Sequence, residues 1–121
     1  MPDGAAAVVL EKGTLDALHG GPDKLAVLHE CARILAPTGV IVSVSFPAVA
    51  RIQLLEHAAR KLGLQSRMRV VAKGDPADGH QAVFVAVLGK ELDAVAEVKD
   101  ALTEMLLDRM RRTVGRCRLN Q

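Results

Sequence analysis

A short apolar run near the start of the chain, closed by a charged break, limits the possible folds more than any other feature. Residues 5–10 carry no polar side chain, and the segment 11–14 that follows reads Glu-Lys-Gly-Thr. An apolar run of this length without polar alternation is typical of a strand buried on both faces, as strands of parallel sheets are. Ligands of open α/β sheets lie beyond the carboxyl ends of such strands. The sequence therefore predicts a cleft at segment 11–14.

The composition indicates one domain with few options for its partners. The chain has 121 residues, of which half are hydrophobic, and its only aromatic residues are Phe46 and Phe84. Without more aromatic side chains there is no stacking platform for single-stranded nucleic acid, and a net charge of +2 does not require a polyanionic partner. No apolar run reaches membrane-spanning length, and the first residues lack the order of a signal peptide. We therefore expect neither nucleic acid nor membrane as a partner.

The cysteines and histidines predict no metal site. Cys31 and Cys117 lie far apart and fit no metal-ligand spacing, so reduced thiols in a cytoplasmic protein are expected. His29 and Cys31 are two positions apart in a predicted helix and therefore do not face the same way.

Periodicity after the first strand predicts a strand–helix–strand unit. Apolar residues recur at intervals of three and four over 22–35, which indicates one apolar face of a helix. A Pro-Gly break follows, and then a β-branched run at 40–46 indicates a second interior strand. Short connections make this a βαβ unit with parallel strands. A second amphipathic helix is predicted at 50–62, with Gly63 as its C-terminal cap.

The pattern changes in the second half of the chain. Residues 67–72 and 81–88 are strand candidates joined by a loop that is rich in turn formers and too short for a crossover helix, so they should be antiparallel. The strand at 81–88 is apolar on both faces and should be interior, whereas the arginine-bearing strand should be an edge. The longest helix is predicted at 91–113 and has a basic end. Cations at the C-terminal end of a helix interact favourably with the helix dipole, which explains the basic end. The alternative is that the basic end docks an acidic partner.

Part of this sequence resembles class I S-adenosylmethionine-dependent methyltransferases. Segment 8–18, Val-Val-Leu-Glu-Lys-Gly-Thr-Leu-Asp-Ala-Leu, is similar to the fourth-strand signature of one branch. That branch includes lysine methyltransferases of translation elongation factor and the methyltransferase fused to an endothelin-converting enzyme. Three further segments agree: 30–40 resembles the stretch before the fifth strand, 42–46 with Arg51 resembles that strand and the arginine after it, and 67–88 resembles the antiparallel sixth and seventh strands.

The resemblance implies an α/β fold over residues 1–90, followed by a C-terminal helix and basic tail over 91–121. The expected sheet is a partial Rossmann-like methyltransferase sheet with strands four, five, seven and six in that order, the last pair antiparallel. Glu11 stands where the family has Asp, and Thr38 where it has a glycine. The chain begins at the fourth strand and contains no Gly-x-Gly. We therefore expect an S-adenosylmethionine-dependent, protein-directed methyltransferase domain that lacks the cofactor-binding N-terminal half and is inactive alone.

The resemblance also implies which residues would line the cleft. Methyl transfer from a sulfonium depends mainly on holding a neutral acceptor amine in line with the methyl group. A carboxylate at the end of the strand would orient that amine or the amino group of S-adenosylmethionine. The residues implied are Glu11, Lys12 and Asp16 for catalysis, Glu11, Gly13 and Thr14 for the cofactor, and Ser45 and Phe46 for the substrate cleft.

Structural explanations remain open for the same residues. Thr14 would cap a short turn, and Asp16 would accept hydrogen bonds from nearby amides. Glu11 and Lys12 would form a solvated pair. These alternatives assign the segment to folding rather than to chemistry.

The first strand carries an expectation about partners. In a complete domain of this family its other side pairs with the family's first strand, so here residues 8–10 are expected to form an unpaired apolar edge, which recruits a second chain. We expect a homodimer, or a complex with a separately supplied N-terminal half, with the helix at 91–113 sharing the interface. Two other interpretations stay open: a non-catalytic interaction module derived from this fold, and an unrelated small α/β domain.

Overall fold

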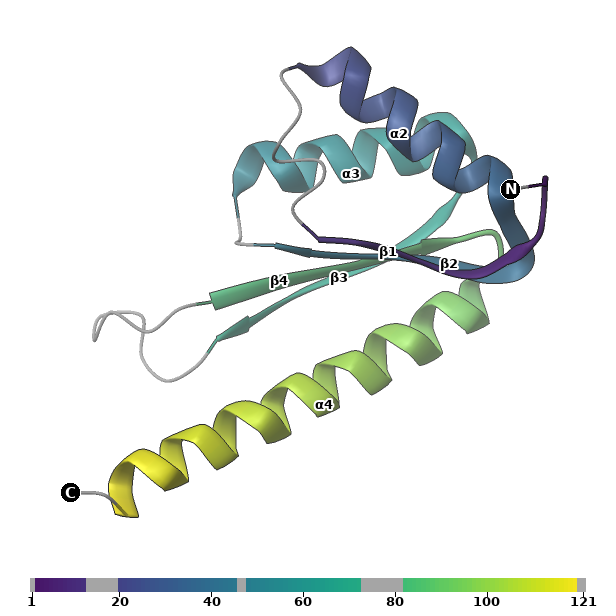
Figure 1. Cartoon of the computed structure of the whole chain (residues 1–121). Coiled ribbons are helices and arrows are strands. Elements are labelled where there is room, and N and C mark those ends of the chain that lie inside the picture. Colours follow the sequence, from purple (N-terminus) through teal and green to yellow (C-terminus); the bar gives the residue numbers. More distant parts are fainter. Residues whose placement is uncertain (1, 13–19, 46–47, 73–81, 120–121) are drawn as a thin grey trace.

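The computed structural model describes residues 2–12, 20–45, 48–72 and 82–119. This part of the chain forms a four-stranded sheet with α2 and α3 on one face and α4 on the other (Figure 1). The α/β fold class is thereby confirmed, while the short turn expected after Thr14 lies outside the described residues. The elements are β1 (Ala6–Glu11), α2 (Gly21–Ile34), β2 (Leu35–Ser45), α3 (Val49–Leu62), β3 (Gln65–Ala72), β4 (Ala82–Gly89) and α4 (Leu92–Leu119).

The strand order is β1-β2-β4-β3, which confirms the order that the resemblance implied. β1 and β2 are parallel, and β3 and β4 are antiparallel, as predicted from the helical and the short connection respectively. β4 is also antiparallel to β2, so it lies inside the sheet with an antiparallel neighbour on each side. The arginine-bearing strand β3 is the edge strand that its charges predicted.

Side chains alternate between the two faces of the sheet and build two apolar clusters. On the face covered by α2 and α3, Ile41 and Phe84 of the sheet pack with Leu28 and Leu55 of the helices. On the opposite face, the sheet packs against α4 through valines. The buried members of this second cluster are Val40, Val42, Val71, Val85, Val87 and Val95.

The start of β2 differs from the sequence prediction. The strand begins at Leu35 instead of residue 40, because the Ala-Pro-Thr-Gly stretch expected to separate helix and strand is extended and joins the sheet. The register shifts there: Ala6 pairs with Leu35, but Val8 pairs with Val40. Gly39 makes this shift possible, since a Cβ on it would lie 2.6 Å from the carbonyl oxygen of Ala6.

The helix ends agree with the sequence more closely on α3 than on α4. Gly63 ends α3 in the left-handed conformation, with φ of 67°, as the glycine cap predicted. α4 continues to Leu119, six residues beyond the predicted end. No helix in the described ranges combines the length and apolar character that a membrane-crossing segment needs.

Candidate functional site

A buried polar cluster lies at the carboxyl end of β1. Glu11, the last residue of β1, is only 3 % exposed, and its Oε2 accepts a hydrogen bond of 2.6 Å from the Ser43 hydroxyl. The Arg51 guanidinium donates to the same Oε2 over 3.1 Å, and its Nη1 lies 3.5 Å from the Ser43 hydroxyl oxygen. Ser43 is fully buried and Arg51 is 6 % exposed. The three side chains thus form an ion pair with a shared hydroxyl, inside the protein.

The elements of the βαβ unit bring these three residues together. Parallel pairing places Glu11 directly opposite Ser43, on the sheet face that α2 and α3 cover. Arg51 lies in the first turn of α3, which begins shortly after β2, so its side chain reaches back over the strand ends. The arrangement places a charge pair in low dielectric surroundings, where breaking it by removing one partner is far more costly than at a surface.

The charge of Glu11 affects the pKa of Cys31 in α2. Partial burial raises the pKa of the Cys31 thiol above its ordinary value, and the nearby Glu11 carboxylate raises the pKa further. The backbone hydrogen bond at Cys31 lowers the pKa, and Glu30 adds a smaller increase. Because the thiolate is the reactive form of cysteine, these influences make Cys31 a poor nucleophile at neutral pH.

The residues implied by the resemblance occupy different environments. Glu11 is buried and engaged, whereas its neighbour Lys12 is exposed, so the two do not form the solvated pair that was one alternative. Ser45 is half-buried at the end of β2, on the same face as Ser43. The remaining implied residues lie outside the described part of the chain: Gly13, Thr14, Asp16 and Phe46.

Two members of the cluster were not assigned a chemical role from the sequence. Ser43 follows three β-branched residues in an interior strand, and a hydroxyl in a buried strand needs a hydrogen-bond partner. Arg51 was matched only as the arginine that follows the strand. The signal for both residues was the combination of a polar residue in a buried strand with a cation in the next helix.

A second feature is the exposed apolar face of the edge strand β1. Val8 is 62 % exposed and Leu10 is 67 % exposed, although both belong to a strand of the sheet. Their register partners Val40 and Val42 are buried on the face that α4 covers, but α4 packs mainly on β3 and β4. α4 therefore leaves the β1 part of this face uncovered.

Other types of site have less support among the described residues. There, His, Cys, Asp and Glu nowhere gather in a group of three or more that would hold a metal ion. A shallow apolar depression lies on α2 and is lined by Ala26, Val27 and Cys31 among others, but not by Glu11, Lys12 or Ser45, the cleft residues that the structure describes.

Comparisons with known proteins place the fold. No family model matches the sequence, and no curated protein matches it either. A protein from Thermus thermophilus, provisionally assigned as a DNA modification methylase, has a similar structure over 74 % of this chain, with a TM-score of 0.54 and 18 % identity. Its complex with S-adenosyl-L-methionine matches over the same share, with a TM-score of 0.52 and 19 % identity.

A third solved structure overlaps less well. An arsenic(III) S-adenosylmethionine methyltransferase from Chlamydomonas reinhardtii matches 72 % of this chain and 37 % of its own, with a TM-score of 0.40 and 20 % identity. The chain spans about half the length of the Thermus thermophilus structures, 47 % and 49 %. At these identities the likeness shows the fold alone: an α/β mixed sheet that resembles the methyltransferase fold.

Proposed function

We propose that this chain is a domain of the S-adenosylmethionine-dependent, protein-directed methyltransferase family that does not transfer methyl groups by itself. Three observations support the proposal: the strand order β1-β2-β4-β3, the Lys-Gly-Thr-Leu-Asp-Ala motif within segment 8–18, and a structural neighbour solved with S-adenosyl-L-methionine. The motif supports the branch that includes lysine methyltransferases of elongation factor. The acceptor of the methyl group would then be a protein side chain.

The observation that carries the proposal of inactivity is the environment of Glu11. A carboxylate orients an acceptor amine only if one of its oxygens reaches the cleft, because methyl transfer depends on positioning the reactants in line. The Oε2 of Glu11 instead accepts hydrogen bonds from Ser43 and Arg51, with 3 % of the residue exposed. Glu11 therefore joins β1 to β2 and α3 through this oxygen, and under this proposal any cofactor contacts come from other residues.

The sequence adds a second reason. In the family that the chain resembles, a glycine-rich turn approaches the methionine part of the cofactor, and an acidic residue holds the ribose. Gly-x-Gly occurs nowhere in the 121 residues. Binding of S-adenosylmethionine would accordingly need a segment that these residues do not supply.

Isothermal titration calorimetry with S-adenosylmethionine tests this proposal. We expect the purified chain to give no saturable heat at cofactor concentrations up to the millimolar range. Stoichiometric binding at micromolar concentration would overturn the proposal. A methyl-transfer assay with lysine-containing peptides as acceptors should give no product above the rate without protein.

A second candidate function is that of a non-catalytic interaction module derived from the same fold. The observation that favours it is the apolar edge of β1, where Val8 and Leu10 are mostly exposed. This candidate and the first one make different demands: the first concerns cofactor binding, and the second concerns self-association or partner binding. They are therefore tested by separate measurements.

A further inference from the structure

The outer side of β1 has the properties of a strand-pairing surface. β1 is the terminal strand in the order β1-β2-β4-β3, so among the described residues only β2 pairs with it. Residues 6–10 are Ala-Ala-Val-Val-Leu and include neither a proline nor a charge. An edge strand exposes a row of backbone donors and acceptors, and proline or charged residues normally protect it against pairing. Residues 6–10 have neither form of protection.

The face beside this edge adds an apolar surface. Val8 and Leu10 are 62 % and 67 % exposed and lie on the sheet face that α4 covers elsewhere. Two large aliphatic side chains two positions apart on a strand stand side by side on one face. A strand added to β1 would therefore gain cross-strand apolar contacts as well as backbone hydrogen bonds.

We propose that the occupant of this edge is a second copy of the chain, joined by antiparallel pairing of the two β1 strands about a two-fold axis. A symmetric dimer requires a self-complementary surface, and residues directly opposite one another in an antiparallel pair lie on the same face. Pairing about Val8 puts Val8 opposite its own copy and Leu10 opposite Ala6 of the other chain. The exposed side chains of both copies then form one cluster. This inference rests on the second candidate function and is independent of cofactor binding.

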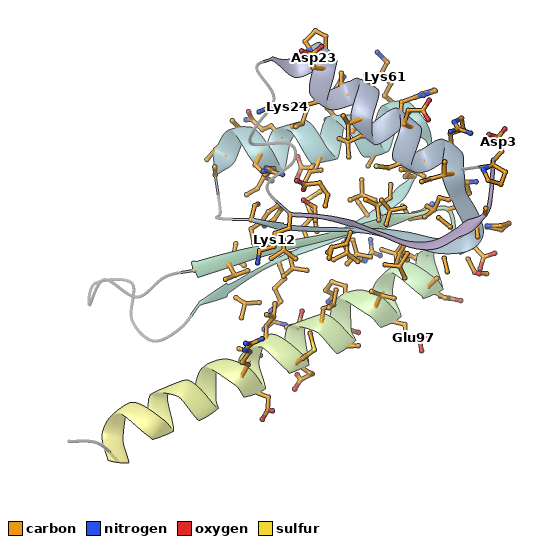
Figure 2. All side chains as sticks on the ribbon, in the orientation of Figure 1. Asp3, Lys12, Asp23, Lys24, Lys61 and Glu97 are labelled. Atoms are coloured by element: carbon orange, nitrogen blue, oxygen red, sulfur yellow. The ribbon has the colours of Figure 1, made fainter. Side chains whose placement is uncertain are left out.

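The charges that flank β1 favour this orientation. Asp3 and Lys12 lie near opposite ends of the strand (Figure 2). The Asp3 side chain is 79 % exposed even though it pairs with Arg33, and Lys12 is exposed as well. Antiparallel pairing brings Lys12 of each copy toward Asp3 of the other, whereas parallel pairing brings like charges together. Opposite charges at both ends therefore match a second copy in the antiparallel direction.

Sedimentation velocity over a range of protein concentrations tests the proposal. We expect a concentration-dependent dimer in the unaltered chain. Leu10→Lys should raise the dimer dissociation constant by at least about a hundredfold, because symmetry places the lost apolar contact in the interface twice. Val70→Lys is the matched control: Val70 is 47 % exposed on β3, the opposite edge of the sheet, and this substitution should leave the dimer intact.

Amide hydrogen exchange on the unaltered chain gives a test that needs no substitution. In the dimer, backbone amides of β1 that point away from β2 should become protected as protein concentration rises, while those of β3 stay unchanged. A monomer at every concentration would overturn the proposal, as would a dimer that Leu10→Lys leaves unaffected. Protection of β1 only after addition of a separately supplied N-terminal half, with its glycine-rich turn, would also overturn the proposal. The occupant of the edge would then be that N-terminal half and not a second copy.

Discussion

The two edge strands of the sheet differ in where their charges lie. β3 carries Arg67 and Arg69 exposed along its length, and α4 packs beside it. β1 carries no charge over residues 6–10, and its one buried charge, Glu11, lies at its end and is turned into the core. Charges along an edge prevent pairing with another chain, whereas a charge buried at the end of a strand leaves the edge available.

Because of this difference, arginine side chains have different surroundings at the two edges. The β3 arginines are solvated and lie where a partner strand would pack. Arg51, although also an arginine, is buried at the β1 end and donates to Glu11 at 3.1 Å. The charges at the end of β1 therefore lie inside the domain, and those of β3 lie at its surface.

The largest expected effect comes from removing the buried guanidinium. Arg51→Met should lower the free energy of unfolding by about 3–5 kcal/mol, because the Glu11 carboxylate stays buried without this cation. Arg69→Met on the exposed edge should change it by no more than about 0.5 kcal/mol. Urea unfolding of both variants measures the contrast. Comparable losses in the two variants would show that the charges at the two edges have the same role.

A double variant sharpens this prediction. Glu11→Gln combined with Arg51→Met removes both charges, so it should unfold less readily than Arg51→Met alone. If the double variant is the less stable of the two, the cost does not come from a buried carboxylate that has lost the Arg51 cation.

The second effect concerns the close approach between Gly39 of β2 and the backbone of Ala6 in β1. In Gly39→Ala the new methyl group would meet the carbonyl oxygen of Ala6 at 2.6 Å, and that backbone atom has no rotamer by which to avoid it. We expect a loss of about 1–3 kcal/mol, together with faster amide exchange in β1 and unchanged exchange in β3. Thr38→Ala, one residue away and exposed, should have almost no effect on either measurement.

The sequence predicted the sheet well, since its signals there are local. Side-chain pattern and connection length predict the parallel pair β1 and β2, the antiparallel pair β3 and β4 and the edge position of β3, while the complete order β1-β2-β4-β3 was implied by the resemblance to methyltransferases. The early start of β2 could not be predicted, because Pro37 is typical of a break. It depends on a long-range contact, the approach of Gly39 to Ala6.

The candidate site was harder to predict than the fold. Glu11 was identified from a motif, but its burial depends on Ser43 and Arg51, which lie 32 and 40 residues further along the chain. A motif gives the residue type at a strand end and not the direction or the partners of its side chain. For this reason the pattern left catalysis, cofactor binding and a solvated pair all open.

A smaller effect should be seen in the chemistry of Cys31. Its raised pKa keeps the thiol protonated at neutral pH, so alkylation should be slow and should accelerate only above the ordinary cysteine pKa. In a Cys117→Ser background, Glu11→Gln should lower the Cys31 pKa more than Glu30→Gln does, because Glu11 is the stronger of the two charges acting on it. The pH dependence of the iodoacetamide reaction measures both shifts. Identical profiles would show that Cys31 does not sense the charge at the β1 end.

The smallest change in stability is expected when the arginines of β3 are removed, which should make that edge, instead of β1, able to pair. Replacing Arg67 and Arg69 with threonine, in the Leu10→Lys background that blocks β1, should alter the free energy of unfolding by no more than about 0.5 kcal/mol for each substitution. Both side chains are exposed, and threonine suits a strand. Self-association should nevertheless appear in light scattering, because β3 then has an uncharged edge beside the half-exposed Val70. If the variant stays monomeric, the packing of α4 beside β3 is enough to protect that edge. The absence of charge from residues 6–10 of β1 would then not explain the difference between the two edges.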